Sequence, residues 1–479
     1  MINVDLERHI LAHCGFEPTQ GQREAVAVIA RFLTRGAGDS VGLLCGYAGT
    51  GKTSLLAALV RTLMAFGQKV VLMAPTGRAA KVLAVNAGMP ALTIHRKIYR
   101  QRVFEGDFNL NDNLHADTLF VVDEASMIAN DGFTQSVFGS GRLLDDLVQY
   151  VYGGRNCRMM LIGDTAQLPP VGEEESPALS ADHMATYDMQ VFAASLTEVL
   201  RQSRQSGILY NADIIRSMIT HDELTQLPRI TFARFADIRI VPGDELIEQL
   251  ATSYSEVGQD ETMVVTRSNK RAAIYNQGIR NTVLGCEEML TTGDMLMIVK
   301  NNYFWTEQQE KAPISFIANG DRAVVRRVRC VHELYGLHFA DLTLSFPDYD
   351  DYELTATAVT DSLMAEAPAL TQEQSQALYD GVMADYADIR HKRDRIDKVR
   401  HDAHFNAVQI KYAYAVTCHK AQGGQWAHVY VDQGYMTDDM VTPDYIHWLY
   451  TAFTRATDKL YLVNWPRQQV ADSDGAPGE

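Results

Sequence analysis

Short apolar runs alternate with amphipathic stretches along the first 205 residues of the chain. Apolar residues at helical spacing predict helices over residues 18–34, 54–66 and 77–84. Short apolar runs predict buried strands over residues 41–45, 69–73, 119–122 and 158–162. Strands that alternate with helices form parallel sheets, whose ligands bind at the carboxyl ends of the strands. We therefore expect an α/β domain in this part of the chain.

A second pattern of the same kind begins at residue 263 and is interrupted. It predicts a strand over 263–266 and a helix over 269–280, and it resumes at residue 413 with strands over 429–431 and 460–463. The intervening stretch is β-rich and punctuated by glycine from 294 to 344, which suits a small barrel, and is polar at helical spacing from 370 to 405. We expect residues 292–405 to be an insertion and residues 466–479 to be a disordered tail.

The composition is that of a globular protein, with 46% hydrophobic and 22% charged residues. No apolar run reaches the roughly 18 to 20 residues that a membrane-spanning helix needs. The first ten residues lack the pattern of a secretory signal. The six cysteines are scattered without a C-x-x-C pair, which indicates a reducing compartment and no disulfide framework. These features predict a cytoplasmic protein without a membrane partner.

The chain is acidic, with 43 Lys and Arg against 60 Asp and Glu and a net charge of −17. This balance argues against non-specific binding of nucleic acid, because phosphate contacts need local positive charge. It does not exclude binding in a groove, where a few basic groups, backbone N–H donors and stacking suffice.

The clearest motif lies between the predicted strand at 41–45 and the helix that follows. Residues 46–53 (GYAGTGKT) match G-x-x-x-x-G-K-[ST] in the strand-turn-helix context that supports a phosphate-binding loop. Its backbone N–H groups and the helix N-terminus would face phosphates, with Lys52 on the β- and γ-phosphates and Thr53 on Mg²⁺. We predict that the nucleotide is held by Gly46, Ala48, Gly49, Thr50, Gly51, Lys52, Thr53 and Ser54.

An acidic pair, Asp123-Glu124, ends the predicted strand at 119–122. Asp123 can bind Mg²⁺ through water, and Glu124 can orient or deprotonate an attacking water. Such a pair is usually an ordinary loop or helix cap, but after a phosphate-binding loop it predicts a nucleotide hydrolase. Kinases and other transferases of the same fold stay open at this point.

Further motifs narrow the class. They are residues 18–25 (PTQGQREA), 74–80 (APTGRAA), 93–95 (TIH), 161–170 (LIGDTAQLPP), 196–202 (LTEVLRQ), 417–423 (TCHKAQG) and 450–456 (YTAFTRA). In this order, over about residues 16–463, the chain resembles superfamily 1 helicases, within the 5′→3′ group of RecD-like and phage Dda-like enzymes. One departure lies at residues 423–426, which read Gly-Gly-Gln-Trp.

The resemblance implies an α/β fold with two RecA-like domains. The first domain would comprise residues 1–95 and 114–205, with a hairpin subdomain at 96–113. The second would comprise residues 206–291 and 406–465, with the 292–405 insertion as an SH3-like subdomain that carries a helical extension. The cleft between the two domains would hold ATP.

The resemblance also implies roles for residues outside the phosphate-binding loop. Gln22 would bind adenine, Gln167 would sense the γ-phosphate, and Gly423 would belong to the nucleotide site. Arg201 and Arg455 would neutralise charge that develops on the γ-phosphate, as arginine fingers do. An isolated arginine near a helix end is more often a surface ion pair, so only the motif context supports these two.

Short polar side chains in loops at strand ends suit the backbone phosphates of a nucleic acid. The candidates are Thr76, Thr93, His95, Thr417 and His419. Such residues serve as helix caps at least as often.

Residues 98–110 predict a β-hairpin, since two stretches with aromatic and β-branched residues flank a Glu-Gly-Asp turn. Its position matches the strand-separating pin of RecD-like and Dda-like enzymes. Phe104 and Phe108 flank the turn and are candidates to stack on the last base pair. The alternative, that both pack the hairpin onto its own domain, carries equal weight.

The sequence as a whole predicts an ATP-dependent DNA helicase that moves 5′→3′ on single strands, with ATP and Mg²⁺ as cofactors. Its partners would be single-stranded DNA and fork junctions, with a single-strand-binding or replication and repair protein as a further candidate. The alternatives are an RNA helicase of the same superfamily and a translocase that does not unwind. The motifs at 417–423 and 450–456 would have no role in a kinase.

Overall fold

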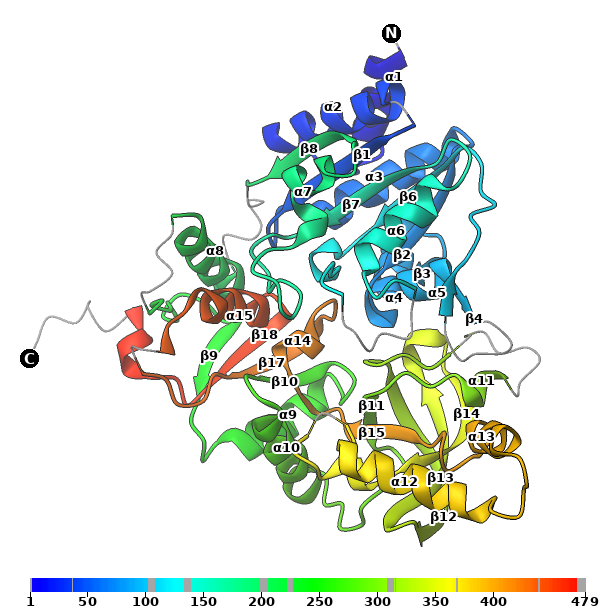
Figure 1. Ribbon diagram of the computed structural model, residues 1–479. Coiled ribbons are helices and arrows are strands. Elements are labelled where there is room, and N and C mark those ends of the chain that lie inside the picture. The colour runs from blue at the N-terminus through cyan, green and yellow to red at the C-terminus, as the bar shows by residue number, and fades with distance from the viewer. Residues whose placement is uncertain are drawn as a thin grey trace, which may run out of the picture.

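The computed structural model describes residues 2–36, 38–101, 108–132, 139–198, 206–221, 227–307, 314, 316–367, 369–437 and 440–471. Two α/β lobes are stacked on each other, and a β-barrel lies beside the second lobe (Figure 1). The first lobe ends near residue 198, and the second begins at residue 206. This arrangement confirms the predicted fold class.

Lobe 1 contains a six-stranded sheet in which every neighbouring pair is parallel. Its strands, in order across the sheet, are β3 (Ala91–Thr93), β2 (Lys69–Ala74), β6 (Thr118–Val122), β7 (Arg158–Gly163), β1 (Ser40–Gly46) and β8 (Gln190–Leu196). Its helices are α1 (Ile2–Ala12), α2 (Gln20–Arg35), α3 (Lys52–Ala65), α4 (Gly77–Ala87), α5 (Ile94–Ile98), α6 (Leu143–Tyr152) and α7 (Ala181–Ala185), with short 3₁₀ turns η1 (Ala125–Met127) and η2 (Pro177–Leu179).

The central strands of lobe 1 are buried on both faces, which explains their unbroken apolar runs. Alternate residues point to opposite sides: Phe120 and Val122 pack in one core with α5 and α6, whereas Leu119 and Val121 pack in another with α1, α2 and α3. Helices therefore cover both faces, and the carboxyl ends of the strands are left for the loops that carry the predicted motifs.

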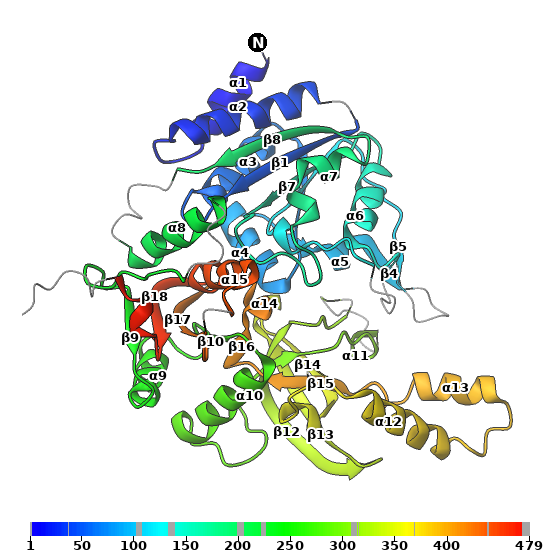
Figure 2. The same cartoon turned by 60° about the vertical axis from the view of Figure 1, so that its left-hand side comes forward.

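Lobe 2 contains a five-stranded sheet, also parallel throughout. Its strands, in order, are β16 (Ala415–Thr417), β10 (Thr262–Thr266), β17 (Trp426–Asp432), β18 (Ala456–Val463) and β9 (Ile238–Val241). Its helices are α8 (Gly207–Thr220), α9 (Leu246–Glu256), α10 (Asn269–Gly278) with a π turn η4 (Ile279–Val283), α14 (Cys418–Ala421) and α15 (Pro443–Phe453). In both views α15 lies on the side of lobe 2 that faces lobe 1 (Figures 1 and 2).

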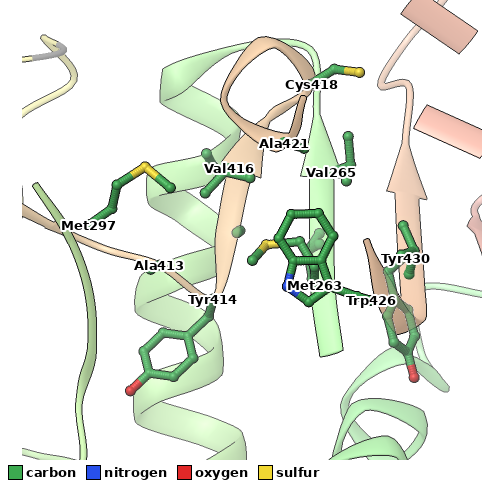
Figure 3. Packing of buried hydrophobic residues seen from close by; sticks show 14 of the residues in the cluster. Met263, Val265, Met297, Ala413, Tyr414, Val416, Cys418, Ala421, Trp426 and Tyr430 are labelled. Atoms are coloured by element: carbon green, nitrogen blue, oxygen red, sulfur yellow. The ribbon is translucent and has the colours of Figure 1, made fainter. Parts of the chain in front are cut away.

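The core of lobe 2 is continuous with that of the barrel. Figure 3 shows Met263 and Val265 of β10 beside Val416 of β16, with Met297 of the barrel on the left, and the buried cluster continues into the barrel. The same buried cluster includes Ala166 from lobe 1. Lobe 2 and the barrel therefore share apolar packing, and lobe 1 reaches into it through a loop.

The insertion forms a closed five-stranded barrel. Its strands are β11 (Met295–Ile298), β12 (Arg322–Leu334), β13 (Leu337–Phe346), β14 (Tyr352–Val359) and β15 (Val408–Tyr412). The parallel pairing of β14 with β15 closes it, so the barrel takes its last strand from beyond the boundary expected at residue 405. The connecting elements are α11 (Phe304–Glu307), η5 (Pro347–Tyr349), η6 (Asp361–Leu363), α12 (Gln372–Asp385) and α13 (Lys392–Arg400). Figure 2 shows α12 and α13 projecting away from the two lobes.

The predicted hairpin is present as a two-stranded antiparallel sheet of β4 (Tyr99–Gln101) and β5 (Phe108–Leu110). Tyr99 pairs with Leu110, and Gln101 pairs with Phe108. Its predicted turn lies outside the described residues. The hydroxyl of Tyr99 donates to Asp146 Oδ2 at 2.6 Å, which ties the base of the hairpin to α6.

The segment from Pro466 was expected to be disordered, and its first part is not. Residues 467–469 form a 3₁₀ turn, η8 (Arg467–Gln469), and Gln469 is buried. The Gln469 amide donates to the Tyr445 hydroxyl and accepts from Gln433, so polar partners inside lobe 2 hold a segment that has little apolar character. Residues 472–479 lie outside the described part of the chain.

No helix among the described residues is long and apolar enough to span a membrane.

Candidate nucleotide site and the contact between the lobes

The phosphate-binding loop lies between β1 and α3, as predicted. Gly49 and Gly51 have φ angles of +75° and +83°, which side-chain-bearing residues rarely adopt. A Cβ at Gly46 would come within 3.0 Å of the Lys52 and Leu196 side chains. Helix α3 starts at Lys52 without a side-chain cap, so its first N–H groups are available to an anion.

Lys52 covers the loop. Its ammonium donates to the Gly46 and Tyr47 carbonyl oxygens at 2.5 and 3.0 Å, and lies 3.9 Å from Asp164 Oδ2. The next two side chains, Thr53 and Ser54, are exposed to solvent, where a hydroxyl can meet a hydrated metal ion. A nucleotide would therefore have to draw Lys52 away from the carbonyl oxygens that it now contacts.

The acidic pair follows β6. The Asp123 carboxylate accepts the Glu124 N–H at 2.9 Å, and Glu124 has a φ of +53°, which turns the chain sharply after the strand. Burial and then the neighbouring Glu124 carboxylate raise the pKa of Asp123 to about 7, whereas the positive charge of Lys52 acts in the opposite direction. A divalent cation fits this environment, because it would compensate the charge of both carboxylates. In the described part of the chain, no cluster of three His, Cys, Asp or Glu side chains could hold such an ion alone, so phosphate oxygens would complete its coordination.

Gln22 joins α2 to the phosphate-binding loop. Its Nε2 donates to the Thr50 carbonyl at 2.9 Å, and its Oε1 accepts the Thr19 N–H at 3.0 Å in a capping box. The side chain is buried, and both ends of the amide have partners. To contact adenine, the Gln22 amide would have to form a further hydrogen bond or exchange one of these two.

The loop after β7 carries two polar side chains that are almost fully buried. Asp164 accepts the Ala166 N–H at 3.0 Å through Oδ1. Gln167 lies next to it, and its Oε1 has no hydrogen-bond partner among the described residues. Because an unpaired buried acceptor is costly, Gln167 is suited to a polar ligand that arrives with the nucleotide.

The 164–168 loop of lobe 1 docks on α15 of lobe 2 and on Gln422, which follows α14. Tyr450 donates to Asp164 Oδ2 at 2.7 Å, and the ring of His447 donates to the Ala166 carbonyl at 2.9 Å. The Leu168 N–H donates to Thr451 Oγ1 at 2.8 Å, and Gln422 Nε2 donates to the Leu168 carbonyl at 2.7 Å. Four side chains of lobe 2 thus hold one loop of the nucleotide site.

Arg455 is buried inside lobe 2. Its guanidinium donates to the carbonyl oxygens of Thr451 and Gly424 and to the hydroxyl of Thr454, at 3.0 to 3.2 Å. These contacts all lie within lobe 2. Two side chains of lobe 2, among the described residues, reach the phosphate-binding loop. The Tyr450 hydroxyl accepts the Ala48 N–H at 2.9 Å, and the guanidinium of Arg216 on α8 lies over the Tyr47 ring, 4.4 Å from its centroid.

The predicted nucleic-acid contacts Thr76 and Thr93 are helix N-caps, as the alternative interpretation anticipated. Their hydroxyl oxygens accept the N–H groups of Ala79 and Arg96. Because a cap uses the oxygen as an acceptor, the O–H remains a donor. Thr417 also begins a helix, but its side chain makes no capping bond.

Gly423, which was predicted to belong to the nucleotide site, packs against the start of α4 in lobe 1. It has a φ of +70°, and a Cβ there would meet Thr76 Oγ1 at 3.0 Å and Ala79 at 3.2 Å. The two segments predicted to bind nucleic acid, one from each lobe, therefore touch at this glycine. Its lack of a side chain permits the contact.

The two histidine candidates differ in environment. Burial lowers the pKa of His95 to about 4, so its imidazole is neutral at neutral pH. His419 is exposed on α14. Desolvation lowers the pKa of His419 as well, so both imidazoles would meet a phosphate at neutral pH as hydrogen-bonding groups rather than as cations. Three other candidates, Arg201, Phe104 and the side chain of Phe108, lie outside the described residues.

The sequence reasoning missed Asp164 and Tyr450 as site residues, although both lie inside motifs that it identified. It also missed Arg78, which lies over Trp426 of lobe 2. For the pair of Arg78 and Trp426, the one hint in the sequence was Trp426 itself, which belongs to the departure from the family pattern at residues 423–426. Nothing in the sequence indicates that these residues meet, because they are far apart along the chain.

Two family models match the chain. An AAA domain matches residues 17–227, and a UvrD-like helicase C-terminal domain matches residues 412–463. The ATP-dependent RecD2 DNA helicase of Deinococcus radiodurans is 33% identical over 184 residues, which cover 38% of this chain and 22% of that protein. The ATP-dependent DNA helicase Dda of phage T4 is 23% identical over 357 residues, which cover 70% of this chain and 75% of that protein. A solved Bacteroides Pif1 helicase in complex with ADP-AlF3 and single-stranded DNA aligns with a TM-score of 0.46 and 15% identity over 97% of this chain and 95% of that one.

Proposed function

Because this chain is a superfamily 1 helicase of the RecD and Dda type, we propose that it uses ATP hydrolysis to move 5′→3′ along single-stranded DNA and to unwind duplex DNA. The observation that carries the proposal is the docking of the 164–168 loop on lobe 2. A movement of this loop at the nucleotide site of lobe 1 would therefore displace residues of lobe 2 that contact it. This is the connection that a two-lobed motor needs.

The chemistry of the proposed hydrolysis belongs mainly to lobe 1. The N–H groups of the phosphate-binding loop and the Lys52 ammonium would bind the phosphates, and Thr53 and Asp123 would hold Mg²⁺. The N–H groups of Ala48 and Thr50 would first have to leave the Tyr450 hydroxyl and the Tyr47 carbonyl that they now contact. Bound Mg²⁺ would neutralise phosphate charge. Glu124 would orient the attacking water and accept its proton, and Gln167 would supply a polar contact near the γ-phosphate. Arg201 and Arg455 are the proposed sources of positive charge from outside the loop.

The proposed DNA contacts lie at the carboxyl ends of parallel strands. Thr76 follows β2, Thr93 ends β3 and Thr417 ends β16, so hydroxyl donors of both lobes are placed at comparable edges. The contact between Thr76 and Gly423 joins these edges. A strand held by few hydroxyl and N–H donors is compatible with the net charge of −17.

An unwinding assay tests the polarity and the substrate together. The purified protein is mixed with ATP, Mg²⁺ and duplexes that carry a 5′ tail, a 3′ tail or a fork, each made as DNA and as RNA. We expect unwinding of the 5′-tailed and forked DNA, little unwinding of the 3′-tailed DNA, and none with Lys52→Ala. Unwinding of the 3′-tailed duplex alone would overturn the polarity, and equal unwinding of RNA would favour the RNA helicase alternative. ATP-driven movement on single strands without unwinding would instead support a translocase.

A further inference from the structure

Tyr450 links lobe 2 by hydrogen bonds to the phosphate-binding loop and to the loop after β7. It lies on α15 and is about 1% exposed. Its hydroxyl accepts the Ala48 N–H at 2.9 Å and donates to Asp164 Oδ2 at 2.7 Å. The hydroxyl therefore donates to one loop of lobe 1 and accepts from another.

Asp164 is a buried carboxylate that needs compensation. It is about 1% exposed, and burial of an unpaired charge is costly. Its Oδ1 accepts the Ala166 N–H, whereas its Oδ2 accepts the Tyr450 hydroxyl and lies 3.9 Å from Lys52 Nζ. Among the described residues, Lys52 is the one that forms an ion pair with Asp164. The phosphates of ATP would need the same ammonium.

Asp164 and a bound triphosphate would thus compete for Lys52. If Lys52 turns to the phosphates, Asp164 loses its cation and must rely on its hydrogen-bond donors. Ala166 supplies one donor from within the same loop. Tyr450 supplies the other from the opposite lobe.

We propose that Tyr450 is a positioning residue of the ATP site, which releases Lys52 to the nucleotide by holding the Asp164 carboxylate from lobe 2. The inference rests on the proposed function, since it assumes that the phosphate-binding loop takes ATP. Because the donor belongs to lobe 2, the release of Lys52 requires contact between the lobes. ATP affinity then depends on lobe closure, independently of any arginine that approaches the γ-phosphate.

The test is equilibrium binding of a fluorescent ATP analogue with Mg²⁺ to the full chain, together with KM and kcat for ATP with saturating single-stranded DNA. In Tyr450→Phe the ring remains, but the donor to Asp164 and the acceptor of the Ala48 N–H are both lost. Without its donor, Asp164 should draw Lys52 closer. We expect Kd and KM to rise about tenfold, the size typical of a lost hydrogen bond to a charged group. The effect on kcat should be smaller, because saturating ATP overcomes the competition.

Tyr445→Phe is the matched control. Tyr445 is also a buried tyrosine of α15, and its hydroxyl donates to Gln433 at 2.6 Å inside lobe 2. Its loss should leave ATP binding unchanged. An equal loss of ATP affinity in both variants would mean that any cavity or polar defect in α15 has this effect, and would overturn the inference.

Asp164→Asn separates charge competition from a general structural effect. A neutral amide does not compete for Lys52, so this variant should bind ATP at least as tightly as the parent. Tyr450→Phe added to it should change Kd by less than about twofold, far below the effect in the parent background. Weaker ATP binding by Asp164→Asn alone would overturn the inference, and this arm remains decisive if Tyr450→Phe fails to fold.

The outcomes distinguish the inference from the proposed function. A parent protein that does not bind the analogue would overturn the proposed function and this inference with it. A parent that binds ATP and unwinds DNA, together with a Tyr450→Phe variant of parental affinity, would overturn the inference alone.

Discussion

The guanidinium of Arg78 in lobe 1 lies over the indole of Trp426 in lobe 2, with Cζ 4.5 Å from the ring centroid. Arg78 also donates to the Gln425 carbonyl and lies 3.7 Å from Glu261. Burial lowers the pKa of Arg78 to about 10, so it stays charged at neutral pH. Arg78 lies two residues after Thr76, and Trp426 lies three residues after Gly423. The contact therefore braces the two segments that we propose to bind DNA.

Loss of this brace should uncouple movement from hydrolysis. Arg78→Ala removes a buried cation–π contact, worth about 1 to 2 kcal/mol, and a neighbouring ion pair. We expect the number of ATP molecules hydrolysed per nucleotide travelled to rise about twofold or more, with hydrolysis itself less affected. Stopped-flow translocation and phosphate release on the same single strands measure this ratio. Arg78→Lys keeps the charge and should be intermediate, and an unchanged ratio in Arg78→Ala would contradict the role.

The sequence predicted the interior of the two sheets better than their edges. Strand β6 was predictable because all five of its residues are buried, which demands an apolar run. In the edge strand β8 only Leu196 is buried and the other residues are exposed or half-buried, so burial does not require a long apolar run there, and the strand was not predicted. The barrel was expected, but its closing strand β15 pairs with β14 across the helical extension, and sequence spacing does not reveal that pairing.

In the site, too, features formed by one chain segment were predictable, whereas contacts between distant segments were not. The phosphate-binding loop was predictable because one chain segment supplies the turn, the lysine and the helix N-terminus. The contact of Tyr450 with Asp164 joins residues 286 positions apart, so only the fold brings them together. The roles of Gln22 and Gly423 were inferred from motif position, and their packing could not be deduced from it.

Arg455 should affect turnover more than nucleotide binding. Its guanidinium is held by Thr451, Gly424 and Thr454, and would have to exchange part of this set to approach a phosphate. In Arg455→Ala we expect parental affinity for an ATP analogue and a large fall in DNA-stimulated hydrolysis. Arginine fingers in GTPases contribute roughly 10³- to 10⁵-fold to the rate. Lys52→Ala should lose hydrolysis outright, because phosphate charge is left uncompensated.

Binding of the analogue and steady-state ATP hydrolysis with saturating single strands measure the two effects separately. Arg455→Lys controls for the buried contacts, since it keeps a positive charge but cannot reproduce the guanidinium geometry. Parental turnover in Arg455→Ala would refute the assignment, and a lower melting temperature without a change in kcat would indicate a structural role within lobe 2.

Asp321 should make the contact between the barrel and lobe 1 sensitive to pH. Its carboxyl accepts the Tyr349 hydroxyl at 2.9 Å and the Ala318 N–H at 2.7 Å, and Tyr349 lies against Gly77 at the start of α4. Burial raises the pKa of Asp321 to about 7. The folded protein thus binds a proton more tightly than the unfolded chain, and stability falls as the pH rises from about 4 to about 7.

Asp321→Asn removes this titration, and comparison with the parent cancels the contributions of other groups. We expect the variant to be more stable than the parent at pH 8, by about 1 to 3 kcal/mol. At pH 5 the difference should be clearly smaller, because the folded carboxyl is protonated, and it should vanish only below about pH 4, where the unfolded chain is protonated too. Thermal melts at both pH values measure it, and a difference that is the same at pH 5 and pH 8 would rule out titration of Asp321 as its cause.

The hairpin of β4 and β5 is our candidate for the element that separates the strands. Its base is fixed to α6 by the bond from Tyr99 to Asp146, so a force on its tip would be carried by lobe 1. Phe104 and Phe108 flank the predicted turn, and an aromatic ring stacked on a base contributes about 1 to 3 kcal/mol. We expect the double change of both to Ala to lower duplex unwinding severalfold, while DNA-stimulated hydrolysis and movement on single strands stay near parental values. Strand-displacement and single-strand translocation assays on the same preparation separate these activities. An equal loss of all three would mean that the phenylalanines pack the hairpin onto lobe 1, and full unwinding by the double variant would exclude these rings as the separating wedge.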